Sequence, residues 1–176
     1  MIQDFILLII LIFFSAYFSS TEMAYIVANK LKIEVRARKK NIAAQSAFHF
    51  VKDPQQFYST ILIGNNIINI AFASIATVVL ATKFGWSDYK ILLFVSVITL
   101  IFGELIPKYI ARESADSLLL VVSIPLRLLS IILFPFIKLT THLSKLLTER
   151  KKDSAKNIAH LFDKEDMKIL VDEVHS

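Results

Sequence analysis

The sequence predicts an all-α membrane protein with three transmembrane helices and juxtamembrane or re-entrant helices that form a belt on the cytoplasmic side. Two observations lead to this fold class. Hydrophobic residues make up 55% of the 176 residues and include 14 Phe, which is more apolar surface than a water-soluble domain of this size buries. These residues also gather in long blocks instead of spreading evenly along the chain.

The apolar blocks cover about residues 5–28, 57–82, 89–111 and 117–143. At ~1.5 Å per residue, a helix made from any of the first three spans the ~30 Å hydrocarbon core of a bilayer. The first block lacks the basic start and the small-residue cleavage pattern of a signal peptide. We therefore expect it to be a retained transmembrane helix.

The basic residues predict the orientation. The segment between the first two blocks, "NKLKIEVRARKKNIAAQSAFHFVKDPQQ", is basic and helix-prone up to Pro54, as expected for short helices along lipid headgroups. Of the 20 Lys and Arg, only Lys83 and Lys90 lie in the turn between the second and third blocks. The positive-inside rule then places the N-terminus outside and the C-terminus in the cytoplasm. This arrangement explains the net charge of +5 without a nucleic-acid partner.

The fourth block differs from the others because it contains Pro125, Arg127 and Pro135. An arginine in mid-membrane is costly, and two prolines would break a straight span. We expect a bent helix that lies on the inner leaflet or dips into it, with Arg127 at the headgroups. An ordinary kinked fourth span is the alternative.

The composition changes again near residue 148, where charged residues replace apolar ones. We expect a transmembrane domain at 1–147 and an acidic cytoplasmic helix or linker at 148–176. The chain has no Cys, which excludes disulfides and thiolate metal sites. It shows no catalytic triad, phosphate-binding loop or histidine metal motif, so we do not expect an enzyme.

Polar residues occur inside the first three blocks. Counted at ~1.5 Å per residue from the block ends, they converge on the inner half of a ~30 Å core. They are Ser19, Ser20, Thr21 and Glu22 in the first block, Asn65, Asn66 and Asn69 in the second, and Gly103 and Glu104 in the third.

The spacing of these residues predicts a cation site. Asn65 and Asn69 are four residues apart and share a helix face, whereas Asn66 lies about 100° round the helix. Pro107 has no N–H, so in an α-helix it leaves the Gly103 carbonyl without a partner. Together with the Glu104 carboxylate these are oxygen ligands, which suit Mg²⁺ or Ca²⁺ better than soft metals.

Two structural explanations compete with this interpretation. Asn and Ser in membrane helices often hold neighbouring helices together by hydrogen bonds. Glu22 and Glu104 also lie near Lys108 and Arg112 in the sequence, and ion pairs with these basic residues near the inner surface would explain both carboxylates. Lys108 marks the predicted cytoplasmic edge.

The stretches "FSSTEMA", "PQQFYSTILIGNNIINI" and "LIFGELIPKYIA" resemble the transmembrane domain shared by bacterial CorC and CorB proteins and animal cyclin M (CNNM) proteins, also called DUF21. The resemblance runs from about Phe14 to Asp116, and "KEDMKILVDE" continues it more weakly. It implies a homodimer in the bacterial inner membrane. It also implies following CBS domains that bind ATP, which we do not find in this chain.

The resemblance implies Mg²⁺ transport, chiefly export, with Na⁺ entry as the driving force. By motif, the ion site of the family falls on Ser19, Asn65, Asn69, Gly103 and Glu104, supported by Ser20, Glu22, Asn66, Pro107 and Lys108. The family's small-residue pattern around the first serine reads "SST" here, so the residue facing the ion can be Ser19, Ser20 or Thr21. Export of another cation, such as a polyamine, and a membrane anchor or regulator that does not transport are the alternatives.

Overall fold

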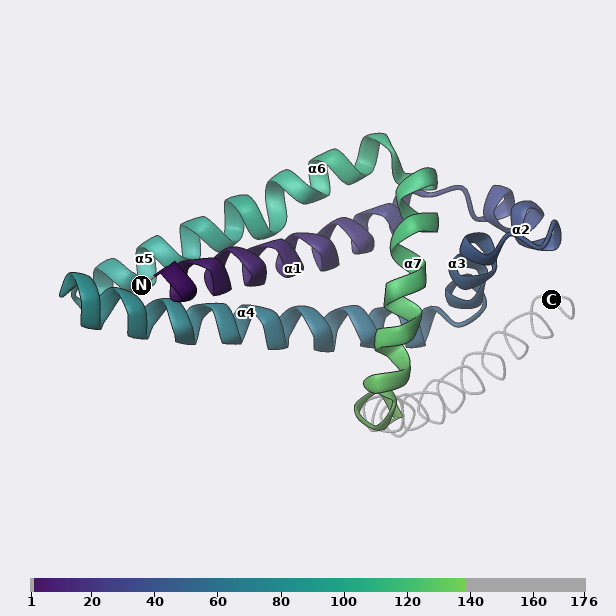
Figure 1. Ribbon diagram of the computed structural model, residues 1–176. Coiled ribbons are helices and arrows are strands. Elements are labelled where there is room, and N and C mark those ends of the chain that lie inside the picture. The colour runs from purple at the N-terminus through teal and green to yellow at the C-terminus, as the bar shows by residue number, and fades with distance from the viewer. Residues whose placement is uncertain (1, 139–176) are drawn as a thin grey trace, which may run out of the picture. The chain divides into compact units, whose positions relative to one another are not determined.

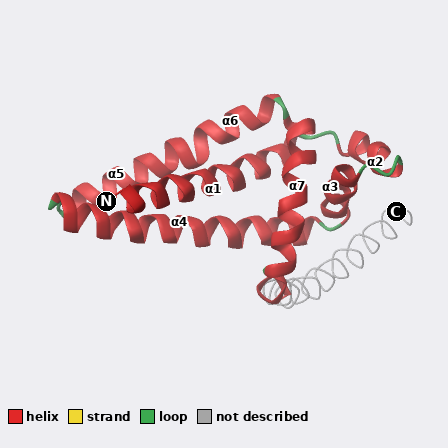
Figure 2. Ribbon diagram, viewed as in Figure 1, coloured by secondary structure: helices red, strands yellow, loops and turns green. Residues whose placement is uncertain are grey.

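The computed structural model describes residues 2–138, whose helices belong to one compact unit, Met1–Ile137. Every regular element in this part of the chain is a helix (Figure 2), which confirms the predicted all-α class. The segment 148–176 and the end of the fourth apolar block lie outside the described residues.

Three long helical rods form the body of this unit. They are α1 (Ile2–Val27), α4 (Pro54–Phe84) and a composite rod made of α5 (Asp88–Ile98), the π-helix η1 (Thr99–Leu105) and α6 (Ile106–Glu113). Figure 1 shows that they run along one another, with successive rods pointing in opposite directions. Each is long and apolar enough to cross a membrane, as the sequence predicts.

A fourth helix, α7 (Ala115–Ile132), is also long and apolar enough to span. In Figure 1 it runs across the three rods instead of alongside them. If the rods lie along the membrane normal, a helix in this direction lies closer to the membrane plane than to the normal. This direction favours the predicted belt over a fourth span.

Pro125 lies inside α7, which runs as one helix from Ala115 to Ile132. The sequence analysis expects a bent helix here, and the proline is accommodated within this single helix. The cost is one missing N–H, which would otherwise have bonded the carbonyl four residues earlier. The flanking turns of α7 are held by buried Leu119 and Leu126, which pack in the apolar core.

The belt also includes the short helices α2 (Lys30–Arg38) and α3 (Ile42–Lys52). Asn29, Asn41 and Asp53 cap α2, α3 and α4, and each side-chain oxygen accepts a backbone N–H three residues on, at 3.0 Å. Such caps satisfy N–H groups that a helix start leaves unpaired. The basic segment therefore folds into separate short helices. We call this end of the molecule the belt end.

Asp116 ties α7 to the start of α2. Its carboxylate accepts the Asn29 backbone N–H and the Lys32 ammonium, both at 2.9 Å. One carboxylate therefore fixes the connection between α1 and α2 against the first turn of α7.

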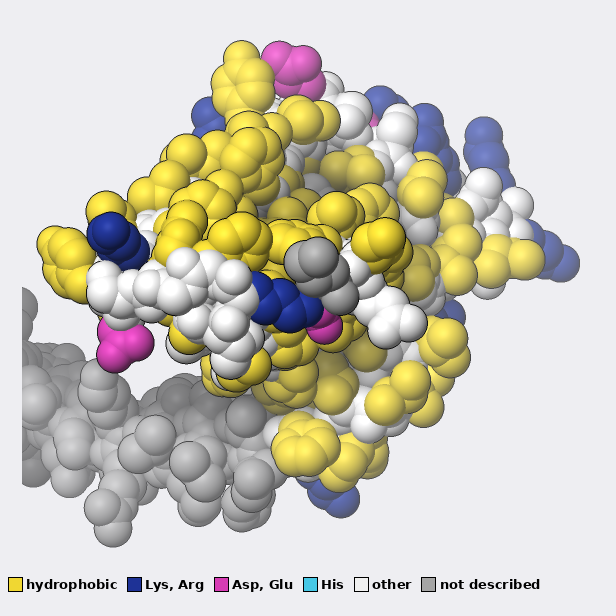
Figure 3. Space-filling model, turned by 60° about the vertical axis from the view of Figure 1, so that its left-hand side comes forward, with side chains coloured by type: hydrophobic (Ala, Val, Ile, Leu, Met, Phe, Trp, Pro, Cys, Tyr) yellow, Lys and Arg dark blue, Asp and Glu magenta, His cyan; other side chains and the backbone are white. Residues whose placement is uncertain are grey.

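The opposite end of the rods is closed by α1, α4 and α5. Asp4 forms an ion pair with Lys83, and the Phe5 and Phe84 rings meet edge to face at 6.3 Å. Gly85, with φ +61°, ends α4 in the left-handed conformation that glycine adopts without strain. Seen toward this end, the surface is largely apolar with few charged side chains, and further Lys and Arg lie behind (Figure 3). We call it the Asp4 end.

Two apolar clusters form the core. The cluster at the belt end includes Phe18, Tyr25, Phe50, Phe57, Leu119 and Leu126. The cluster toward the Asp4 end includes Leu11, Phe72, Ala76, Leu80, Ile91 and Val95. On α4, the predicted asparagines lie between Ile61 of the first cluster and Phe72 of the second. On α1, the predicted polar residues follow Phe18, at the edge of the belt-end cluster.

Candidate cation site

We call the region around Ser15, Ser19, Asn65, Asn69 and Gly103 the polar zone. Its first contact joins α1 to α4. The Ser15 hydroxyl, 1% exposed, donates to Asn69 Oδ1 at 2.8 Å. Because an amide oxygen has two lone pairs, Asn69 Oδ1 keeps a second one for another partner. Ser15 is absent from the predicted site residues, although it precedes Ser19 by four residues and so shares its helix face.

One helical turn toward the belt end, the same two residue types recur. Ser19 follows Ser15 by four residues on α1, and Asn65 precedes Asn69 by four on α4. Because the two helices are antiparallel, both steps lead about 6 Å in the same direction. Ser19 Oγ and Asn65 Oδ1 are buried, and neither has a hydrogen-bond partner within the described chain.

This pair of unpartnered oxygens is the unusual feature of the site. A buried polar atom left without a partner costs about 1–3 kcal/mol, and most buried polar groups in folded proteins are paired. Two such oxygens one turn beyond a paired Ser–Asn contact indicate a place for a positively charged or hydrogen-donating ligand.

The structure distinguishes the three hydroxyls of the "SST" stretch. Ser20 and Thr21 both donate to the Tyr17 carbonyl, at 3.0 and 2.6 Å. Ser19 makes no such bond. Of the three, only the Ser19 hydroxyl is both buried and unpartnered among the described residues.

The third rod reaches the site through Gly103, which is buried. A Cβ built on this residue would lie 2.7 Å from Ser15 Oγ, which is too close for a real side chain. Gly103 therefore allows the backbone of η1 to approach α1 at the level of the Ser15–Asn69 contact. No other residue type fits this approach without displacing Ser15.

The backbone around Gly103 is a π-helix, which the sequence analysis did not predict. The Ile106 N–H bonds the Ile101 carbonyl, five residues back instead of four. In this register the next acceptor is the Phe102 carbonyl, and Pro107 has no N–H to give it. The α-helical count that leads to the Gly103 carbonyl therefore does not hold within η1. Wide turns of this kind often occur at functional sites.

The carboxylates Glu22 and Glu104 differ in their contacts. Glu22 on α1 pairs with Lys108 on α6 at 3.1 Å, and both side chains are about a third exposed. The ion pair that the structural explanation predicts is therefore present for Glu22. Glu104 is half-buried and, within the described residues, has neither a hydrogen bond nor an ion pair.

The remaining predicted residue, Asn66, is exposed on α4 and does not share the face of Asn65 and Asn69. In the described part of the chain, no three or more His, Cys, Asp or Glu side chains lie close enough together to hold a metal ion. A cation held here would therefore rely on hydroxyl, amide and carbonyl oxygens with one carboxylate, Glu104.

Comparison with known proteins identifies the family. Residues 6–176 match the family described as "Cyclin M transmembrane N-terminal domain". The chain belongs to the cyclin M (CNNM) family. The family is described as a transmembrane domain, and the helices of this CNNM domain make it a multi-pass membrane protein.

Relatives of this CNNM domain occur in bacteria and plants. It is 32% identical over 146 residues to a UPF0053 protein of Haemophilus influenzae, covering 82% of this chain and 35% of the relative. It is 29% identical over 136 residues to the UPF0053 inner membrane protein YfjD of Escherichia coli, covering 76% and 31%. A chloroplastic DUF21 domain-containing protein of Arabidopsis thaliana is 30% identical over 141 residues, covering 79% and 21%. The chain thus spans about a third or less of the length of these relatives.

Proposed function

We propose that this CNNM domain binds Mg²⁺ between α1, α4 and η1 and carries it across the bacterial inner membrane. The observation that carries this proposal is the pair of buried, unpartnered oxygens on Ser19 and Asn65. If Ser19 and Asn65 served only to hold the helices together, they would be expected to bond each other, as Ser15 bonds Asn69 one turn away.

The surrounding groups suit a hard divalent cation. Mg²⁺ prefers oxygen ligands in a near-octahedral arrangement and gives up its waters reluctantly. Ser19, Asn65 and Asn69 supply neutral side-chain oxygens, and Glu104 supplies negative charge. The η1 backbone next to Gly103 supplies the Phe102 carbonyl, to which Pro107 has no N–H to donate. One carboxylate leaves excess positive charge on the complex, which helps the ion to leave again.

The route to the cytoplasm passes Glu22 and Lys108. Glu22 lies one turn beyond Ser19 on the belt side, where Lys108 pairs with it. We place this end in the cytoplasm because the basic helix α2 lies there. Na⁺ entry as the driving force, a homodimer, and regulation by ATP through separate CBS domains complete the proposal.

A flux experiment in proteoliposomes tests the function. Mg²⁺ release is followed with an encapsulated Mg²⁺-sensitive dye, with and without an opposing Na⁺ gradient, for the wild type, Asn65→Ala, Asn69→Ala and Glu104→Gln. Each variant is expected to lose most of the Mg²⁺ flux. Thr77→Ala serves as the control because its exposed hydroxyl on α4 bonds only the Ala73 carbonyl, and it is expected to transport normally.

The same preparations separate the alternatives. If Asn69→Ala and Glu104→Gln transport Mg²⁺ normally but their helices assemble less stably, the domain is an anchor or regulator, and the transport proposal is wrong. Competition of putrescine with Mg²⁺ for binding would instead favour polyamine export. Flux that does not respond to the Na⁺ gradient would remove the coupling and leave Mg²⁺ transport in place.

A further inference from the structure

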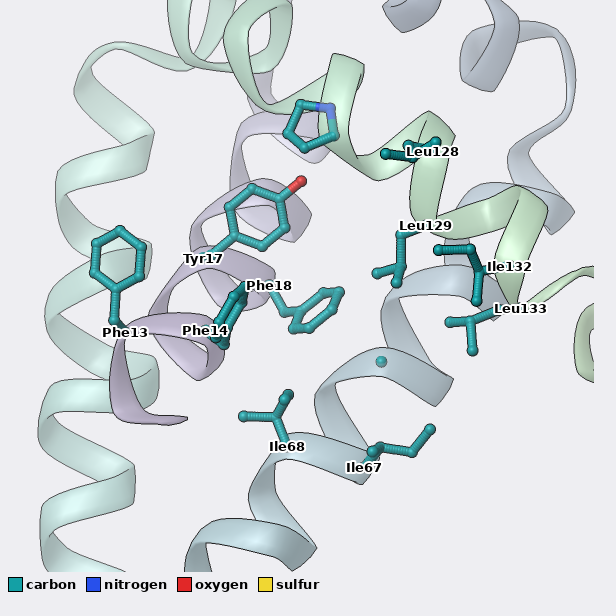
Figure 4. Close-up of a pocket in the computed structure, with 12 residues that line it drawn as sticks. Phe13, Phe14, Tyr17, Phe18, Ile67, Ile68, Leu128, Leu129, Ile132 and Leu133 are labelled. Carbon is teal, nitrogen blue, oxygen red and sulfur yellow. The ribbon is translucent and has the colours of Figure 1, made fainter. Parts of the chain in front are cut away.

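A recess of about 530 Å³ lies between α1, α4 and α7 (Figure 4). We call it the α7 recess. Phe14 and Phe18 reach it from α1, Ile67 from α4, and Leu128 and Ile132 from α7. It belongs to the size range of ligand pockets, about 300–1,000 Å³.

The α7 recess is separate from the candidate cation site. The mean direction of the residues lining it lies roughly 150° round α1 from Ser15 and Ser19 and roughly 130° round α4 from Asn65 and Asn69, counted at ~100° per residue. Phe18 and Ile68 are the lining residues nearest to the site, about 60° from Ser15 and Asn65. The two sites therefore occupy different faces of the same pair of helices.

The lining offers almost nothing to a polar ligand. Tyr17 supplies the only polar side chain among the described residues that line the recess, and its hydroxyl already donates to the Val122 carbonyl at 2.8 Å. Gly64 adds no polar group, and no larger residue fits at this position, because a Cβ there would lie 2.4 Å from the Phe18 ring. The occupant must be apolar, since a polar group inside would lose its hydrogen bonds to water.

The position of α7 relates the recess to the membrane. Arg127 is exposed, and Leu129 and Ile132 lie roughly 140–160° round α7 from it, counted at ~100° per residue. With its basic side toward the headgroups, α7 turns its recess side toward the hydrocarbon core. The recess therefore faces acyl chains rather than water.

The volume decides between a lipid chain and a second protein copy. A helix is about 10 Å across, so 530 Å³ holds only about one helical turn. A cavity of roughly 150 Å³ holds one benzene, so the same volume takes an acyl chain on the order of 20 carbons. A flexible chain fills such a recess, whereas a rigid helix from another copy does not.

We propose that the α7 recess is a binding site for one acyl chain of a membrane phospholipid, wedged between the crosswise α7 and the α1–α4 pair. Each CH₂ buried there contributes to retention through the hydrophobic effect. The lipid becomes part of the packing that holds α7 against the transmembrane rods, and this does not depend on which ion the other face binds.

Native mass spectrometry of the protein purified in mild detergent tests the proposal. Ile67→Trp fills the recess from α4, and Leu128→Trp fills it from α7. Each is expected to retain one phospholipid fewer per protomer than the wild type. Leu62→Trp is the matched control: Leu62 is 62% exposed and Ile67 52%, but Leu62 lies roughly 140° round α4 from Ile67. It is expected to retain as many lipids as the wild type.

Two results would overturn the proposal. Equal lipid retention in the wild type and in both filling variants would show that no chain is held in the recess. Loss of the dimer with unchanged lipid retention in the same spectra would assign the recess to a second copy of the chain. The outcome is independent of Mg²⁺ transport, so failure here leaves the proposed function intact, and the converse also holds.

Discussion

Two neighbouring layers of the polar zone have the same composition and differ in their bonding. In one layer, Ser15 and Asn69 satisfy each other across α1 and α4. In the next, Ser19 and Asn65 offer the same hydroxyl and amide, yet their oxygens have no partner among the described residues. The residue types are identical, so composition alone does not explain the difference.

The comparison separates two roles that polar residues take in membranes. A paired Ser–Asn contact holds two helices together, and in membrane proteins it contributes about 0.6 kcal/mol on average. An unpaired one weakens the fold unless a ligand completes it. The hydrogen bond of the first layer therefore fixes the spacing of the two helices, and Asn69 Oδ1 keeps a second lone pair for a ligand. The second layer, with two unpartnered oxygens, is the main binding layer.

Removing the binding layer is expected to have the largest effect. With a ligand at one hundred times its Kd, binding stabilises a protein by about 2.7 kcal/mol. The Ser19→Ala, Asn65→Ala double variant is expected to lose this Mg²⁺-dependent gain, because it lacks both unpartnered oxygens. Thermal unfolding in detergent with and without Mg²⁺ measures it, and an undiminished shift would contradict the comparison.

A side chain at Gly103 is expected to disturb both layers. In Gly103→Ala the new Cβ would lie 2.7 Å from Ser15 Oγ, and such overpacking typically costs about 1–3 kcal/mol. Unfolding midpoints in detergent measure the loss.

A second substitution makes this prediction specific. Without its hydroxyl, residue 15 would present only its Cβ, 3.4 Å from the new methyl group. Ser15→Ala is therefore expected to restore part of the stability of Gly103→Ala. If the double variant is no more stable than Gly103→Ala, the close contact is not the cause.

Breaking the support layer alone is expected to cost less. Ser15→Ala removes the hydrogen bond to Asn69 and is expected to lower stability by about 0.6–1 kcal/mol. Ser19→Ala removes an unpartnered buried hydroxyl and is expected to leave stability without Mg²⁺ unchanged or slightly higher. Without Mg²⁺, the unfolding midpoint of Ser15→Ala is therefore expected to lie below that of Ser19→Ala. A lower midpoint for Ser19→Ala would refute the comparison.

The ion pair of Glu22 and Lys108 is expected to matter least for stability. Both side chains are about a third exposed, and exposed pairs contribute at most about 1 kcal/mol. Lys108→Met is expected to shift the unfolding midpoint slightly, and less at high salt. A large shift that does not depend on salt would show that Lys108 has a structural role beyond this pair.

Much of this arrangement could be predicted from the sequence. Apolar block lengths give the three rods to within a few residues, and counting depth along them brings the polar residues to the same half of the rods. The count is about one turn off for Gly103, which lies beside Ser15 and not beside Ser19. The coincidence is readable because an α-helix has a fixed rise per residue. The side-chain period of ~3.6 likewise places Asn65 and Asn69 on one face and excludes Asn66.

Two features were missed for physical reasons. Ser15 stands alone among apolar neighbours, and only its four-residue spacing from Ser19 could have marked it. The π-helix depends on which carbonyl each N–H selects, and seven residues in the wide register carry no separate periodic signal in the sequence. Pro107 indicates an interruption in the ladder without giving its register, so the carbonyl it releases was assigned by the α-helical count.

The π-helix also sets the phase of everything that follows it. In a regular α-helix, residues five apart point about 140° away from each other, so Gly103 and Lys108 would not both face α1. Yet Gly103 packs against Ser15 and Lys108 pairs with Glu22, and these two α1 residues lie seven apart on one side. Because each residue of the π-helix turns the chain by less than about 100°, Gly103 and Lys108 point in more similar directions than they would in an α-helix. Deleting one residue within Thr99–Leu105 would turn α6 by roughly 100° and carry Lys108 away from Glu22 while leaving α5 in place.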